Sequence, residues 1–383
     1  MLRNTWRVTR REFRRLLGDR RLLFVMMGFP LLGAILLNIM YLERVVNHIP
    51  TAVYDRSGTA LSRTVIQAFA DSERFEIVKS VTSEEEMRRA IETKEVQVAL
   101  VIPEDYARDI KKGHGSRVLV AVNGTNFLYS NAVLSTAGSI VGTLAGGTTV
   151  MALEGQGYLP QEARDMAAPV QLSTRVWYNP YFNYPNFLML GLVATMIQQA
   201  LLLYVATAIT REKEQGTLGE LLEQNYSATQ VVLGKTAPYF LLNFLNLNFI
   251  LAGCYYVFKI PFNGSIWNLL LMEVLFLGGI TALGIFLSTA CKTQLEATQL
   301  AMLFALPSFL FSGYTWPLES MPEFARGVAA LFPLTYFAAN LRDIALMDLQ
   351  LPVMLKDIIV LGAMNIVLLP AAILLFKKQY HQQ

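Results

Sequence analysis

The sequence predicts an α-helical integral membrane protein with six transmembrane helices and an α/β domain inserted between the first and second. Hydrophobic residues make up 54% of the 383 residues and charged residues 16%, with a mean hydropathy of +0.39, which exceeds the usual apolar content of a soluble domain. The apolar residues gather in six runs, at 22–42, 187–208, 237–258, 267–290, 298–313 and 358–376. About 20 helical residues cross a hydrocarbon core of about 30 Å, so 298–313 is short and the other runs suffice.

Basic residues predict the orientation in the membrane. The first 21 residues hold eight arginines against Glu12 and Asp19, which indicates a cytoplasmic N-terminus. Six crossings return the tail, 379–383, to the same side, directly after Lys377 and Lys378. The first apolar run is too long for a cleaved signal peptide, so we expect a retained anchor. The prediction is a multi-pass protein of the bacterial inner membrane with both termini cytoplasmic.

The N-terminal segment 1–21 is predicted to form an amphipathic helix on the inner leaflet, in contact with membrane lipids. Five residues of one face follow spacings of four and three, and four arginines repeat that spacing one residue on: Leu2, Trp6, Thr9, Phe13 and Leu16, then Arg3, Arg7, Arg10 and Arg14. An alternative is a topology signal with fortuitous periodicity. Nucleic acid is not an expected partner, because a basic stretch joined to a span faces anionic lipid first.

Residues 43–186 are predicted to fold as an extracytoplasmic α/β domain. Strand-like runs at 51–54, 75–81, 96–102 and 117–122 alternate with helical stretches at 59–71, 84–93 and 106–112. This alternation favours a small mixed or parallel sheet. Gly, Ser and Thr are frequent in 128–154, which we interpret as a long helix packed on a neighbour. A seventh span there would place Lys377 and Lys378 outside the cell.

Metal, redox and catalytic signals are scarce. The three histidines, His48, His114 and His381, lie far apart without a ligand spacing, so no metal centre is expected. Cys254 falls in the third predicted span and Cys291 at a cytoplasmic edge, so no disulfide is implied for the outer domain.

Polar residues inside the spans are candidates for function or for helix packing. Glu273 is a carboxylate inside the fourth span, where an acid is a functional candidate by default, although it could also pair or reach the interface. Asn243, Asn246 and Asn248 in the third span are interpreted as interhelical hydrogen-bonding groups rather than a substrate site.

The triplet Gly234-Lys235-Thr236 resembles the end of a phosphate loop without meeting its requirements. The first glycine of such a loop would stand at 229, which is Thr229, and the loop should leave a strand. The capping box Ser227-x-x-Gln230 instead predicts a helix start leading into the third span. The sequence contains no complete phosphate loop, and its cytoplasmic pieces are too short to fold as an ATPase domain. Any process driven by ATP must therefore receive its energy from another chain.

A second capping box, Thr217-x-x-Glu220, predicts a short cytoplasmic helix before that span, with Leu218, Leu221 and Leu222 on one face. An isolated helix of this length is marginal in water, so an amphipathic one beneath a membrane protein suggests docking to a partner. The alternative is a solvated connector.

Two segments resemble ABC transporter permeases of the type-2 exporter family. "REKEQGTLGELLEQ" (211–224) is similar to the coupling segment after the second span. "FSGYTWPLESMPEFARGVAALFPLTYFAANLRDIAL" (311–346) is similar to the segment between the fifth and sixth spans, through Gly313, Pro317, Met321-Pro322, Pro333-Leu334-Thr335-Tyr336 and Arg342. The resemblance covers the first span, the N-terminal helix and 187–378, and the insert looks like that of the subgroup with a large extracytoplasmic domain.

The resemblance implies a transporter of two permease chains, identical or paralogous, with two ATPase subunits that bind ATP and Mg. This chain would hold no cofactor and would not be an enzyme, and a periplasmic adaptor would be a further partner. Segment 211–224 would sit in a cleft of the ATPase. The residue types suggest rim contacts by Arg211, Glu212 and Glu214, a packed face of Leu218, Leu221 and Leu222, and close approach at Gly216 and Gly219.

Four prolines interrupt the pattern after the short fifth run: Pro307, Pro317, Pro322 and Pro333. Backbone broken at membrane depth must be buried in protein or line a cavity. The resemblance implies re-entrant short helices over 307–342 at the outer end of a translocation path, and the alternative is an ordinary outer loop.

Two other classes of protein remain open. A membrane receptor or scaffold would also carry an outer ligand-binding domain but needs a cytoplasmic output module. A secondary transporter needs no ATPase but usually has midplane ionisable groups and internal repeats. The residues favour the exporter permease.

Overall fold

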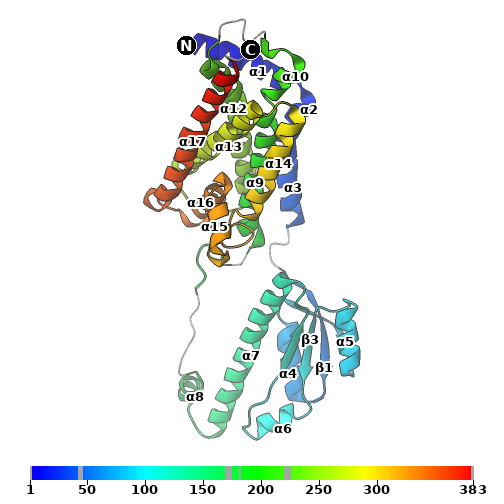
Figure 1. Cartoon of the computed structure of the whole chain (residues 1–383). Coiled ribbons are helices and arrows are strands. Elements are labelled where there is room, and N and C mark those ends of the chain that lie inside the picture. The colour runs from blue at the N-terminus through cyan, green and yellow to red at the C-terminus, as the bar shows by residue number, and fades with distance from the viewer. Residues whose placement is uncertain (1, 42–45, 169–174, 181–182, 220–225, 381–383) are drawn as a thin grey trace. The chain divides into compact units, whose positions relative to one another are not determined.

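The computed structural model describes residues 2–41, 46–168, 175–180, 183–219 and 226–380 (Figure 1). The chain divides into two compact units. Unit 1 comprises Met1–Arg44 and Val176–Gln383, and unit 2 comprises Val45–Arg175, which lies within the insert predicted at 43–186.

Unit 1 is a helical bundle around α9 (Tyr184–Ala206), whose residues are mostly buried. The helices packed on it are α3 (Phe29–Met40), α12 (Ala228–Tyr256), α13 (Ile266–Ala290), α14 (Gln294–Leu310) and α16 (Pro333–Met347). The last long helix, α17 (Leu351–Tyr380), packs on α13. Helix α10 (Thr210–Gln215) and the C-terminal end of α17 lie at one end of the unit, and α15 (Glu323–Ala329) and α16 lie toward the other (Figure 1).

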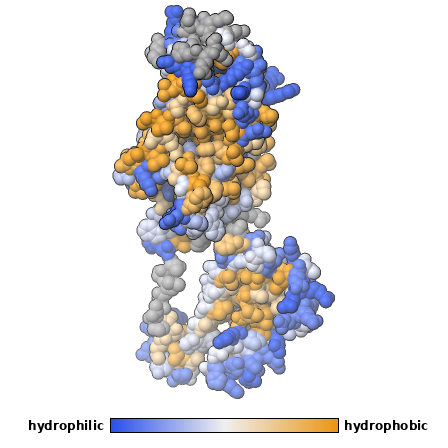
Figure 2. All heavy atoms as spheres, viewed as in Figure 1, coloured by the Kyte–Doolittle hydropathy of each residue, from blue (hydrophilic) through white to orange (hydrophobic). Residues whose placement is uncertain are grey.

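The N-terminal helix α1 (Leu2–Gly18) lies at the same end as α10 and packs on α12. Asp19 then accepts hydrogen bonds from the amides of Arg21 and Leu22 and caps the short helix α2 (Arg20–Leu23). A π-helical turn, η1 (Phe24–Gly28), joins α2 to α3. The visible face of unit 1 carries a broad band of hydrophobic residues (Figure 2), as a surface covered by lipid tails would.

Six helices in the described part of the chain are long and apolar enough to cross a membrane: Arg20–Met40, Tyr129–Gly155, Tyr184–Gln215, Ala228–Tyr256, Ile266–Ala290 and Leu351–Gln379. The number agrees with the predicted six spans, but the set differs at two places. The fifth predicted span, 298–313, corresponds to α14, whose 17 residues extend only about 25 Å. The set instead includes Tyr129–Gly155 of unit 2, the helix that the sequence interpretation had excluded as a span.

The first part of that helix, α7 (Phe127–Gly155), packs on α4 and β4 of unit 2. Val133 and Ala137 are buried in the core of unit 2, and Ile140 and Leu144 pack against it. Length and composition admit α7 as a span, whereas these contacts match the predicted helix packed on a neighbour.

Unit 2 contains a four-stranded mixed sheet in the order β2-β1-β3-β4. The strands are β1 (Ile49–Asp55), β2 (Phe75–Ser80), β3 (Val98–Ile102) and β4 (Leu119–Val122). β1 pairs in parallel with β2 and β3, and β4 is antiparallel to β3, so the mixed form of the predicted sheet is present. The helices are α4 (Ala60–Ala70), α5 (Glu84–Glu92), α6 (Tyr106–Lys111), α7 and α8 (Pro160–Ala167).

The side-chain alternation of the strands produces two hydrophobic layers in unit 2. Ile49 and Val53 of β1 face a core shared with α4 and α7. Ala52, between them, faces a smaller core that includes Ala90 of α5. The sheet is therefore covered by helices on both faces, the α/β arrangement that the alternation of strands and helices predicts.

Candidate functional site

The candidate site is the end of unit 1 where α10 meets the ends of the long helices. The amides of Ile209 and Thr210 donate to Ser288 Oγ at 2.7 and 3.2 Å. Lys213 Nζ donates to the carbonyls of Thr289 and Cys291 at 2.6 and 2.9 Å, which supplies a cation to the C-terminal end of α13. These contacts fix α10 to the end of α13.

Cys291 follows α13 directly and is buried beneath α10. Burial and the nearby Glu296 carboxylate raise the pKa of its thiol, and the Lys213 ammonium opposes them. The thiol is therefore neutral at physiological pH and behaves as a small packing group.

Helix α10 also contacts the start of α14. Glu214 accepts a hydrogen bond from the Gln294 amide at 2.7 Å and contacts the Gln294 side chain. Arg211 Nε donates to Gln294 Oε1 at 3.3 Å. A carboxylate at a helix N-terminus is favourable, so these two predicted rim residues tie α10 to α14. No contact with another chain tests their predicted role.

A buried charge network joins α10 to α1 and α12. Lys235 Nζ of α12 donates to Glu12 Oε2 of α1 at 3.0 Å and to Glu212 Oε1 of α10 at 2.9 Å. Arg15 Nη1 donates to Glu212 Oε1 at 3.2 Å, and the Tyr239 hydroxyl donates to Glu12 Oε1 at 2.9 Å. Lys235 is 1% exposed, and both carboxylate residues are 3% exposed. Glu212, predicted as a rim contact, is therefore buried, because it neutralises a lysine inside the chain.

The network explains the triplet that resembles a phosphate loop. Gly234, Lys235 and Thr236 lie inside α12, so the predicted helical context is confirmed. A Cβ at Gly234 would lie 2.6 Å from Val8 Cβ, so the glycine allows α1 to cross α12 closely. The lysine carries the ion pairs, and the threonine hydroxyl donates to Val232 O at 3.0 Å.

The rest of the coupling segment begins at a helix end. Gly216 adopts the left-handed conformation, with φ of 70°, that ends α10. The Thr217 hydroxyl donates to the Glu212 carboxylate, and Leu218 packs against the core of unit 1. A helical turn begins at Leu218 and Gly219, whereas Glu220, Leu221 and Leu222 lie outside the described residues. The predicted capping box between Ser227 and Gln230 is confirmed at the start of α12.

The segment predicted as re-entrant contains two short helices, α15 and α16. Pro307 lies inside α14, Pro317 caps the 3-10 turn η2 (Leu318–Ser320), Pro322 caps α15, and Pro333 starts α16. Most residues of α16 are buried against α9 and α13, including Phe337, whose ring stacks on Phe276 at 4.1 Å. The expected enclosure by protein therefore holds for α16, whereas Pro317, Pro322 and most of α15 are exposed.

Aromatic contacts hold this segment to the start of α9. Gly313, with φ of 77°, turns the chain so that the Tyr314 hydroxyl donates to Phe187 O. The Tyr314 ring stacks on Phe187 at 5.8 Å, and the Arg342 guanidinium lies 5.4 Å from that ring's centre. A Cβ at Gly191 would lie 2.1 Å from the Tyr314 ring, so only glycine admits this approach.

Three asparagines of the third span were predicted to form interhelical hydrogen bonds, and two of them do. Asn248 Nδ2 donates to Glu273 Oε2 at 2.6 Å, joining α12 to α13. Asn246 Nδ2 donates to Met27 O in the π-helical turn at 3.3 Å. Asn243 donates within its own helix, to Tyr239 O at 2.9 Å. Glu273 is fully buried, and its Oε1 has no hydrogen-bond partner in the described part of the chain.

Sequence reasoning missed Lys235 and Glu12 as a pair. The available signal was weak: Glu12 lies four residues from both Val8 and Leu16, so it is an acid on the packed face of an otherwise basic helix. A buried acid requires a cation, and Lys235 sits just as unexpectedly among apolar neighbours.

Long apolar helices around a buried α9, with the buried ion pairs of Lys235 at one end, are typical of a helical multi-pass membrane protein. The sequence profile of the ABC-2 family transporter protein matches residues 20–374. The chain is 25% identical over 353 residues to the "Probable multidrug ABC transporter permease YbhR" of Escherichia coli K12, covering 92% of each chain. It is 24% identical over 382 residues to the "Inner membrane transport permease YhhJ" of the same strain, covering 98% of each.

A third relative, the "Probable multidrug ABC transporter permease YbhS" of Escherichia coli K12, is 29% identical over 187 residues and matches 49% of each chain. The chain belongs to the ABC-2 family of transporters. It is a multi-pass inner-membrane permease subunit of an ABC transporter, and the relatives are permease subunits rather than enzymes.

Proposed function

We propose that this chain is the permease subunit of an ATP-driven exporter and forms the translocation path with a second permease chain. Separate ATPase subunits would bind ATP and Mg and dock on segment 211–224. The observation that carries this proposal is the attachment of α10, which is bound to α1, α12, α13 and α14 by short polar contacts. A displacement of α10 by a closing ATPase pair would therefore move several span helices together.

We propose a topology in which the α10 end of unit 1 is cytoplasmic. The arginines of α1 and Lys377 and Lys378 of α17 gather at that end, as the excess of positive charge on the inner side requires. The chain leaves unit 1 after α3 and re-enters at α9, and the rings of Tyr41 and Tyr184 at these points lie 5.4 Å apart. Unit 2 and segment 307–342 would then face the periplasm.

The second permease would be an identical chain or a paralogue, and unit 2 would be available to an adaptor protein. Two relatives are named as multidrug transporters, and we extend that cargo class to this chain as part of the proposal. The family favours this function over the receptor and the secondary transporter, neither of which requires α10 to be fastened to the spans.

The test of the proposal is capture of the ABC ATPase partner that the family implies. Replacing Leu221 and Leu222 by Asp puts charges on the face assigned to the ATPase cleft. Burying an unpaired carboxylate costs several kcal/mol, roughly a thousandfold in affinity. The variant should insert and elute like the parent protein, yet lose ATPase copurification and export.

The matched control is Leu100→Asp, a buried leucine of β3 in unit 2. It should damage unit 2 and leave ATPase capture intact. Unchanged ATPase affinity of the Leu221 and Leu222 variant would make 211–224 a connector and remove this coupling site from the proposal.

A further inference from the structure

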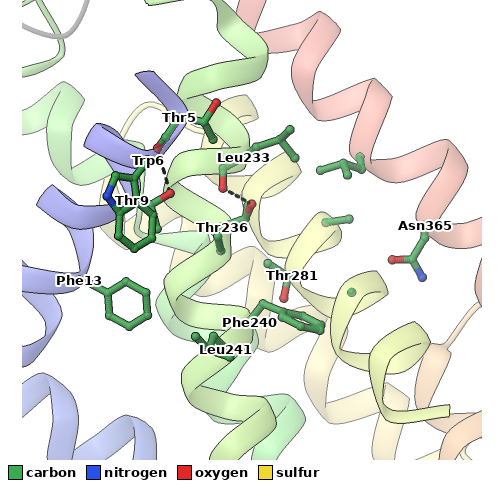
Figure 3. A pocket seen from close by; sticks show the side chains of 14 residues that line it. Thr5, Trp6, Thr9, Phe13, Leu233, Thr236, Phe240, Leu241, Thr281 and Asn365 are labelled. Carbon is green, nitrogen blue, oxygen red and sulfur yellow. Dashed lines mark hydrogen bonds between the residues drawn. The ribbon is translucent and has the colours of Figure 1, made fainter. Parts of the chain in front are cut away.

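An open groove of about 750 Å³ lies beside α1, between α12, α13 and α17. This volume falls in the range of about 300–1,000 Å³ typical of ligand sites. Figure 3 shows Trp6 and Phe13 of α1 on one side, Phe240 and Leu241 of α12 along the groove, and Asn365 of α17 opposite.

Four polar side chains of the groove donate hydrogen bonds to backbone carbonyls of their own or adjacent helices. The hydroxyls of Thr9, Thr236 and Thr281 donate to the carbonyls of Thr5, Val232 and Leu277, respectively, at 2.9, 3.0 and 2.6 Å. Asn365 Nδ2 donates to Leu275 O and Leu361 O. The groove therefore presents mainly methyl groups and aromatic rings, which suits a hydrocarbon occupant better than a polar one.

The edge of the groove on α1 carries positive charge. One face of α1, with Val8, Glu12 and Leu16, is buried against the bundle. The groove-lining residues lie beside this face on the helix surface, and the arginines lie beyond them. Arg3 and Arg10 are exposed and lie three and four residues from Trp6, which makes them its neighbours on the helix surface. Arg7 and Arg14 continue the same exposed basic stripe.

We propose that the groove binds an anionic phospholipid of the inner leaflet, with an acyl chain along the aromatic and methyl lining and the phosphate on Arg3 and Arg10. Two independent features coincide here: an apolar groove and a basic rim on a helix that leads directly into the first span. Basic sites at the cytoplasmic ends of membrane helices bind anionic headgroups, and each buried methylene favours retention of the chain. The lipid would be a structural ligand that holds α1 in place, separate from any transported cargo.

The experiment labels the full-length protein in nanodiscs with phosphatidylglycerol or phosphatidylcholine that carries a photoreactive acyl chain. The parent protein should be labelled on α1 and α12 peptides, with phosphatidylglycerol preferred. Ala237→Trp places a ring in the groove from an exposed position and should abolish labelling there, whereas Ala252→Trp, exposed on the same helix but outside the groove, should not.

A second experiment tests the basic rim with two double variants. The first carries Arg3→Gln and Arg10→Gln, and the control carries Arg20→Gln and Arg21→Gln. The first pair should lose the phosphatidylglycerol preference by up to about thirtyfold, from roughly fivefold for each arginine near an anionic surface, and the second pair should keep it. Equal labelling by both lipids, equal loss in both tryptophan variants, or stronger labelling by a photoreactive fatty acid would overturn the proposal. Cross-links from these groove residues to a second copy of the chain in place of lipid would also overturn it.

Discussion

Replacing Lys235 by Met should destabilise unit 1 strongly, because it leaves two buried carboxylates with one cation. Glu12 and Glu212 are each 3% exposed and lie 3.0 and 2.9 Å from Lys235 Nζ. After the change, Glu212 keeps Arg15 as a partner, and Glu12 keeps the hydroxyl of Tyr239, a neutral donor. Removing one member of a buried pair costs about 3–5 kcal/mol, which greatly exceeds the loss from a surface ion pair.

The magnitude can be measured from thermal unfolding of the purified chain. A loss of about 3–5 kcal/mol should lower the midpoint by roughly 5–10 °C. Lys292→Met removes an exposed lysine near the same end and should change the midpoint by no more than about 1–2 °C.

A second substitution separates the charge from the packing. Glu12→Gln in the Lys235→Met background removes the stranded charge while keeping an acceptor for Tyr239, and it should restore at least half of the lost stability. If Lys235→Met behaves like the exposed control, or if Glu12→Gln gives no rescue, the three groups do not form an energetically coupled network.

Two further pairs of substitutions test the contact between Gly191 and the Tyr314 ring and the buried carboxyl of Glu273. Gly191→Ala drives a methyl group into the Tyr314 ring and should cost about 1–3 kcal/mol in thermal stability, whereas Gly253→Ala, with open space around it, should be tolerated; equal effects would refute the close contact. Glu273→Gln keeps an acceptor for Asn248 and should retain stability, whereas Glu273→Leu should lose about 1–3 kcal/mol; loss of export in the stable Gln variant would assign the carboxyl a transport role.

Most of the fold could be predicted from local patterns, because each depends on few neighbouring residues. The strand expected at 75–81 appears as β2 (Phe75–Ser80), and the helix expected at 84–93 as α5 (Glu84–Glu92). The helix at 128–154 shows the limit of such patterns. Helix α7 is long and apolar enough to cross a membrane and yet packs part of one face on unit 2, so length and composition alone do not separate these two environments.

The candidate site was predicted only in part, because its contacts join residues far apart in the chain. Segment 211–224 was identified by local capping and by resemblance, and the structure places Arg211 and Glu214 at its surface-facing contacts with α14. The burial of Glu212 depends on Lys235 and Arg15, which come from two other helices. Without these partners, the charged residues that precede Gly216 and Thr217 are typical of an exposed helix end.

The desolvation cost of burying the charges of the Lys235 network suggests a role beyond stability. Apolar residues of similar volume often stabilise a core as well as a buried ion pair does, so stability alone does not account for it. A lysine buried without its carboxylate partners is strongly unfavourable, however, so the network disfavours any registration of α1 on α12 other than the one that pairs Lys235 with Glu12. We interpret it as a device that fixes this registration. Such a device would keep α1 attached to α10 when an ATPase moves the coupling segment, which is the property that the proposed transmission of movement requires.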